Sequence, residues 1–256
     1  MSLRLCAVAL VLLSACAGKR VPPPEDAVRL HRQCAEALAA SEYEDARLFC
    51  QGASAQAPQF AEAWQDLGVA LLSAGKTAEA VEPLERARAL DDRLWRTHNG
   101  LGIVAFVAGD HGKAEGHFKR AVELKPEAAE PRYNRAWNFF RWERLHEARE
   151  ELRAVVKQHP SLGHPVQFLG IVLLTEGRVP EAIEAMVEAI TREPGQCRNW
   201  LGMGNGYAAD RRYEEAMSAL VTCVELCPSD PICGAAVEQL RTREAVPLAK
   251  PRDLIP

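Results

Sequence analysis

The sequence predicts an all-α protein: a right-handed solenoid of six helix-pair repeats, closed by one further helix at the C-terminal end. Residues 27–230 divide into six units of 34 residues without an insertion: 27–60, 61–94, 95–128, 129–162, 163–196 and 197–230. Five units carry a proline at position 32, namely Pro58, Pro126, Pro160, Pro194 and Pro228. A period of this length indicates stacked helix pairs, each burying its apolar face on the next.

Small residues recur at two positions of the unit, one in each expected helix. Those of the first helix are Gly68, Gly102, Ala136, Gly170 and Gly204, and those of the second are Ala80, Ala114, Ala148, Ala182 and Ala216. Small residues let antiparallel helices approach closely, while larger apolar residues fill the space beside them. With Trp64, Leu67 and Tyr207 at further fixed positions, the pattern resembles the tetratricopeptide repeat over about four fifths of the chain.

Turn and cap residues agree with the same phase. Gly75, Gly109 and Gly177 fall where a first helix should end, which suits a left-handed C-cap. Asp230 and Pro231 are typical of the start of a helix. We therefore expect a capping helix over 231–244 and a loose tail over 245–256. Asp92, where the period calls for proline, has no explanation at this level.

Residues 1–15 have the pattern of an export leader. Arg4 precedes an apolar run that is too short to span a bilayer, and Leu-Ser-Ala-Cys follows. This resembles a bacterial lipobox, which implies cleavage before Cys16 and a diacylglycerol on its thiol. An ordinary signal peptide with an incidental cysteine is the alternative. Because Ala17, and not aspartate, follows the cysteine, the resemblance implies the periplasmic face of the outer membrane.

Residues 16–26 are interpreted as a tether between this anchor and the first repeat. They include Pro22, Pro23 and Pro24. Proline-rich segments favour extended polyproline II, at about 3.1 Å per residue. The first repeat should therefore lie within a few nanometres of the membrane.

The charge balance and the motifs exclude several functional classes. A net charge of -4 provides no basic excess for nucleic acid. The seven histidines are scattered, and the sequence has neither a glycine-rich phosphate loop nor a nucleophile motif. We expect no enzymatic activity, cofactor, resident metal or small-molecule substrate.

Six cysteines remain after Cys6 of the leader and Cys16, and export permits disulfides. Cys34 and Cys50 occupy facing positions of the first helix pair, which predicts a bridge between them. Cys197 and Cys227 stand at adjacent ends of the sixth pair, and Cys223 should meet Cys233 on the following helix. Metal binding by the last three cysteines is the alternative, although their spacing is not a usual zinc pattern.

The surface that lines the inside of such an array is the expected binding site. In tetratricopeptide arrays the first helices form a groove, and positions 2, 5, 9, 12 and 13 of each unit project into it. The resemblance therefore places in the groove an apolar set that repeat packing does not require: Val69, Leu72, Ile103, Phe106, Tyr133, Trp137, Phe140, Ile171 and Leu174. Large apolar residues in a groove predict a protein-binding site. Burial of this set between neighbouring first helices is the alternative.

The lipobox, tether and six repeats together resemble the pilotins of type IV pili. Members of that family are outer-membrane lipoproteins that bind secretin subunits and support secretin assembly. The resemblance implies a secretin monomer as partner, with Trp137 and Phe140 as the first anchors. A general envelope scaffold, serving peptidoglycan enzymes or β-barrel assembly, is the alternative.

Overall fold

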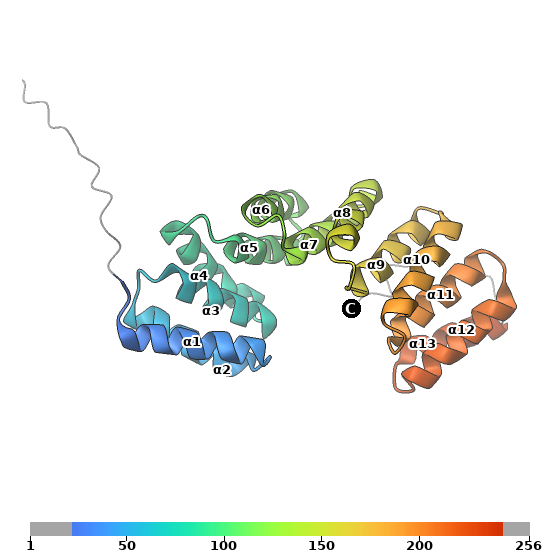
Figure 1. Cartoon of the computed structure of the whole chain (residues 1–256), viewed down its shortest axis with the longest axis horizontal. Helices are drawn as coiled ribbons and strands as arrows, with labels where there is room; N and C mark the ends of the chain where they lie inside the picture. The colour runs from blue at the N-terminus through green and yellow to red at the C-terminus, as the bar shows by residue number, and fades with distance from the viewer. Residues whose placement is uncertain (1–21, 243–256) are drawn as a thin grey trace, which may run out of the picture.

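The computed structural model describes residues 22–242, which form thirteen helices joined by short turns (Figure 1). The predicted lipidation site Cys16 lies outside these residues. The helices are α1 (Glu25–Ala39), α2 (Tyr43–Gln56), α3 (Ala61–Ser73), α4 (Thr77–Leu90), α5 (Trp95–Val107), α6 (His111–Leu124), α7 (Ala129–Arg141), α8 (Leu145–Gln158), α9 (His164–Thr175), α10 (Val179–Arg192), α11 (Cys197–Ala209), α12 (Tyr213–Leu226) and α13 (Pro231–Thr242).

The helices pair in sequence order and stack into an arch. Along the middle and C-terminal parts of the arch, odd-numbered helices lie on the inner side and even-numbered helices on the outer side (Figure 1). Helices α3, α5, α7 and α11 each begin on the first residue of a 34-residue unit. The described residues 22–242 contain no strand. None of the helices among them is both long and apolar enough to cross a bilayer.

Each helix pair closes on one contact between a small and a large side chain. A Cβ atom added at Gly68 would lie 2.5 Å from Leu84 Cδ2, and one added at Gly102 would lie 2.5 Å from Phe118 Cε1. Leu84 and Phe118 are themselves buried, with 0% and 1% of their surface exposed. Any larger residue at the glycines would push the two helices apart, which is why this position stays small.

A left-handed residue ends the first helix of every repeat. The backbone angle φ is +75° to +78° at Gly75, Gly109 and Gly177, so the predicted glycine caps are confirmed. The same position in the other three repeats holds Ser41, Glu143 and Arg211, with φ between 61° and 63°. Side chains with a Cβ atom are strained in this region, whereas glycine is not.

Replacing Arg211 by glycine should therefore stabilise the C-terminal repeat. The gain expected from relief of left-handed strain is about 1 kcal/mol. Thermal and denaturant unfolding would measure it, with Arg211→Ala as the matched control. The alanine variant also removes the long side chain but keeps the Cβ atom, so an equal gain in both variants would contradict the explanation.

The structure explains the missing proline at position 92. Trp64 Nε1 donates a hydrogen bond to the backbone carbonyl of Pro58 at 3.1 Å, and Trp200 donates to that of Pro194 at 3.0 Å. In the third repeat, His98 takes the place of tryptophan, and its Nε2 lies 3.0 Å from the Asp92 carbonyl and 3.3 Å from the Asp92 carboxylate. The exchange of proline for aspartate thus accompanies an exchange of tryptophan for a smaller, titratable donor.

His117 makes this junction sensitive to acid. Its ring centroid lies 5.9 Å from that of His98. Burial lowers the pKa of His117, and the neighbouring His98 and Arg88 lower it further, with Lys113 acting in the same direction and Glu85 against it. The folded chain therefore binds a proton at this site less readily than the unfolded chain does.

The consequence is a loss of stability on acidification. It should begin as the pH falls through about 6.5, the unfolded pKa of histidine, and level off below the lower pKa of the folded state. Thermal unfolding of the wild-type protein and of His117→Gln between pH 7.5 and pH 5 would test this. We expect the wild type to lose more stability than the variant over that range, and equal losses would show that His117 does not contribute.

Three disulfides join helices near the two ends of the solenoid. Cys34 bonds to Cys50 between α1 and α2, Cys197 to Cys227 across the sixth repeat, and Cys223 to Cys233 between α12 and α13. These are the pairs expected from the repeat phase. Each end of a solenoid has only one neighbouring repeat, so covalent links there oppose fraying.

The final helix begins with the expected cap. Asp230 Oδ1 accepts a hydrogen bond from the backbone N–H of Ile232 at 2.9 Å, and Pro231 is the first helical residue. Cys233, Ala236 and Val237 are buried in one cluster with Leu220. Helix α13 therefore covers apolar surface that the sixth repeat would otherwise expose.

Candidate functional site

A cleft of about 380 Å³ opens along the first three repeats. Its walls are apolar and come from three successive first helices: Leu38 from α1, Val69 and Leu72 from α3, and Ile103 from α5. The remaining lining residues are Ala35, Ala39, Tyr43, Asp66, Ser73, Arg96, Asn99, Gly100 and Glu130. Most of them occupy unit positions 2, 5, 9, 12 or 13, whose projection into the groove was expected.

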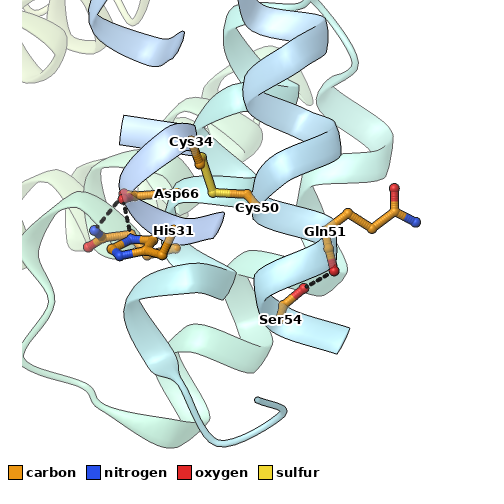
Figure 2. The surroundings of a disulfide bond; sticks show 7 residues. His31, Cys34, Cys50, Gln51, Ser54 and Asp66 are labelled. Carbon is orange, nitrogen blue, oxygen red and sulfur yellow. Dashed lines mark hydrogen bonds and ion pairs between the residues drawn. A yellow bond between two sulfur atoms is a disulfide. The ribbon is translucent and has the colours of Figure 1, made fainter. Parts of the chain in front are cut away.

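One side of the cleft has a buried acidic group that is fully hydrogen-bonded. Asp66 is only 6% exposed. Its Oδ2 lies 2.8 Å from His31 Nε2, and its Oδ1 accepts a hydrogen bond from Gln65 Nε2 at 3.0 Å. Figure 2 shows His31 of α1 directed toward Asp66 of α3. This pair therefore joins the first repeat to the second beside the cleft, and its side chains are fixed before any ligand arrives.

A second polar group links the third and fourth repeats. Asn99, 4% exposed, donates through Nδ2 to Glu130 Oε1 at 3.1 Å. Its Oδ1 accepts from Asn134 Nδ2 at 3.0 Å. Asn99 and Glu130 occupy unit positions 5 and 2, which were expected to face the groove, but the contact between them was not predicted. The sequence contained one indication of this contact network: Asn99 and Asn134 occupy neighbouring positions in the first helices of successive units.

The disulfide of the first repeat stiffens one wall of the cleft. Cys34 lies on α1, one residue before the lining residue Ala35, and it bonds to Cys50 of α2 with a Cα–Cα distance of 5.3 Å (Figure 2). Both cysteines are fully buried. The terminal repeat, which has no preceding neighbour, is thereby held in place where it forms the cleft.

Only some of the predicted groove residues line the cleft. Val69, Leu72 and Ile103 line the cleft. Phe106 is half-buried and packs with Ile103 against Ala105, Ala114 and Phe118. The others, Tyr133, Trp137, Phe140, Ile171 and Leu174, belong to repeats four and five and do not line it.

Placing Phe140 and Ile171 on an accessible surface was wrong, because they are 1% and 6% exposed. The cause is Phe168, a buried aromatic residue whose position in the unit holds no aromatic in any other repeat. Its ring centroid lies 5.4 Å from that of Phe140 and 4.5 Å from that of Trp137, with which it stacks. In this part of the arch neighbouring first helices bury the set against each other, which was the alternative interpretation.

Trp137 and Tyr133 are held in the same cluster. Both are partly buried against the core of repeats four and five, as is Leu174 against a neighbouring cluster. Tyr133 lies 5.7 Å from Phe168 between ring centroids, and burial raises the pKa of its hydroxyl. Phe140 is therefore a core residue and Trp137 is partly buried beside it, so neither lines the cleft of repeats one to three.

The cysteine-rich end does not form a metal site in this oxidised state. Among residues 22–242, the one cluster of three potential ligands consists of Cys197, Asp230 and Cys233. Both cysteines are bonded to other cysteines, so neither offers a thiolate.

Comparison with known families decides the class of the fold. Residues 37–96 and residues 99–163 match two models, each described as a tetratricopeptide repeat. The chain has the fold of a tetratricopeptide-repeat solenoid. No curated protein sequence matches the chain.

Solved structures share the tetratricopeptide fold at low identity. PilF of Pseudomonas aeruginosa gives a TM-score of 0.72 at 16% identity, covering 86% of this chain and 98% of PilF. The anaphase-promoting complex assembly Cut9–Hcn1 gives 0.69 at 18%, covering 82% of this chain and 42% of the other. YrrB, described as having an unusual peptide-binding site, gives 0.59 at 20%, covering 74% and 97%. At these identities the likeness shows a shared fold.

Proposed function

We propose that this tetratricopeptide-repeat protein is an outer-membrane lipoprotein of the pilotin type, which holds a secretin subunit in its inner cleft and supports secretin assembly. The observation that carries the binding role is the cleft itself: apolar walls, polar groups fixed by internal hydrogen bonds, and a disulfide that stiffens one wall. Its volume of about 380 Å³ falls within the usual range of binding clefts.

The lining defines the chemistry of the client segment. Leu38, Val69, Leu72 and Ile103 would receive apolar side chains. Arg96 and Glu130 are exposed at the cleft and would pair with polar or charged groups beside those side chains. An amphipathic segment of the client meets both requirements. In this proposal the cleft holds such a segment of the secretin monomer and shields it from aggregation until the ring forms.

Two observations support the pilotin assignment beyond protein binding. The sequence Leu-Ser-Ala-Cys16 behind an apolar leader fits a lipidated, exported protein. The fold matches PilF of Pseudomonas aeruginosa over nearly the whole of both chains. A lipid anchor would keep the cleft at the membrane, which raises the effective concentration of cleft and client for each other.

Changing the cleft should abolish client binding without unfolding the protein. We expect Leu72→Gln, which introduces an amide into the apolar wall, to weaken secretin binding at least tenfold and to reduce secretin multimers. Arg96→Glu, at an exposed position, should weaken binding severalfold with unchanged thermal stability. The matched control is Leu48→Gln, because Leu48 is 55% exposed on α2 and does not line the cleft.

Co-purification from membranes, combined with multimer detection on denaturing gels, measures these effects. Normal multimers with both cleft variants would overturn the assignment of the cleft. If cell-wall enzymes co-purify instead of a secretin, and the cleft variants no longer recover them, the cleft remains the binding site. The general envelope scaffold would then be the favoured function.

Removing the proposed lipid site tests the anchor separately. Cys16→Ala should release the protein from the membrane fraction and reduce secretin multimers, because a few acyl chains supply the membrane affinity. Radiolabelled palmitate incorporation and fractionation would measure the outcome. Unchanged membrane association would contradict lipidation at Cys16, while the result for the cleft variants would stand independently.

A further inference from the structure

A second hollow, of about 390 Å³, lies between α10 and α12 with α11 as its floor. It is separate from the inner cleft, because none of its lining residues lines that cleft; Figure 1 shows the three helices at the C-terminal end of the arch. Val187 and Ile190 of α10 form one wall, while Trp200, Met203 and Tyr207 of α11 form the floor. Its lining is therefore mainly apolar.

An equivalent hollow lies between repeats one and two, and it allows a comparison within the same chain. There Gln51 and Ser54 occupy the unit positions of Val187 and Ile190. Arg47 and Glu82 also line that hollow. Both hollows have an apolar floor, which in the first one consists of Trp64, Leu67 and Leu71. The hollows differ in the wall, and because the first repeat forms its helix pair with Gln51 and Ser54, pairing does not require apolar residues at these two wall positions.

Exposure singles out one unit position. Position 25 holds Gln51, Glu85, Lys119 and Arg153 in the first four repeats but Val187 and Val221 in the last two. Val187 is 48% exposed and Val221 38% exposed. Exposed valines at a position that is otherwise polar leave an apolar patch on the outer face, which is a feature of interaction sites.

Glutamates outnumber basic residues on the two helices that flank this patch. Helices α10 and α12 together carry six glutamates, Glu181, Glu184, Glu188, Glu214, Glu215 and Glu225, against the single cation Arg192. Three of the six form ion pairs: Glu188 with Arg192, Glu181 with Arg178 and Arg153, and Glu215 with Arg212. Glu215 lines the hollow, and a backbone hydrogen bond together with Arg212 lowers its pKa, so it stays ionised. Arg212 stands at the edge, just before α12, over the ring of Tyr207. The outer helices α6 and α8, by contrast, mix both signs.

We propose that this outer hollow is a second docking site, which takes a basic amphipathic helix of a partner protein. The groove between two neighbouring helices of four turns accommodates a third helix of similar length. Apolar side chains of that helix fill the space between Val187 and Tyr207, and its lysines or arginines face the glutamates of α10 and α12. The site is independent of the inner cleft.

Fluorescence anisotropy with synthetic peptides would test the proposal. The full chain is held in phosphatidylcholine nanodiscs, with empty nanodiscs as the blank. The probe is a labelled 14-residue helix of leucine and lysine with one apolar stripe, and its counterpart carries glutamate for every lysine. We expect the basic peptide to bind at least tenfold more tightly than the acidic one, and its affinity to fall as salt is raised.

Substitutions that introduce the residues of the first repeat at positions 25 and 28 would locate the site. Val187→Gln with Ile190→Ser should weaken binding of the basic peptide at least tenfold. Val187→Gln alone should weaken it severalfold, and as an exposed change it leaves folding intact. The matched control Val81→Gln alters a valine that is 38% exposed on α4, away from the hollow, and should have no effect.

Four results would overturn the proposal. They are equal binding of the two peptides, equal effects of the Val187 and Val81 variants, loss of binding in Leu72→Gln instead, and a dimer of the wild type that Val187→Gln dissociates. The third result would place the peptide in the inner cleft. The fourth would mean that the outer patch is covered by a second copy of this chain.

Discussion

The close contact between positions 8 and 24 of each repeat is the constraint on which the rest of the structure depends. Gly68 meets Leu84, Gly102 meets Phe118, and Gly204 meets Leu220, each leaving no room for a Cβ atom. In the first repeat the same two positions hold Cys34 and Cys50, so a covalent bond replaces the packing contact. This contact sets how closely the two helices of a pair approach each other.

The period predicted this constraint, the left-handed caps, and the cysteine pairs that the structure contains, because all of them depend on position within the unit. It did not predict which first helices would leave an opening. Phe168 closes the space beside Phe140, whereas the corresponding residues in repeats two and three are Asp66 and Gly100. A single residue thus decides whether this surface is part of the core or open as a cleft. Comparison of one sequence with the average repeat does not identify such a residue.

Polar partners were equally hidden from the sequence. Arg135 stands where leucine is usual, and its guanidinium bridges Glu115 and Glu151 while lying over the ring of Phe139. Asp92, which breaks the proline series, offers both its backbone carbonyl and its carboxylate to His98. Each exception is paired with another residue 6 to 20 positions away. Such pairs become visible only once the helices are placed, since the contact, and not either residue alone, makes the departure tolerable.

Departures from the repeat are informative where packing does not explain them. Val69 and Ile103 at position 9 and Leu38 and Leu72 at position 12 line the cleft, and Val187 and Ile190 at positions 25 and 28 of repeat five line the hollow. In both places another repeat of the same chain has a different residue at the same position without loss of the helix pair. Formation of the helix pair therefore does not set the choice of residue at these positions, and the two binding proposals rest on these departures. The cleft and the hollow share no helix, because α10, α11 and α12 line only the hollow.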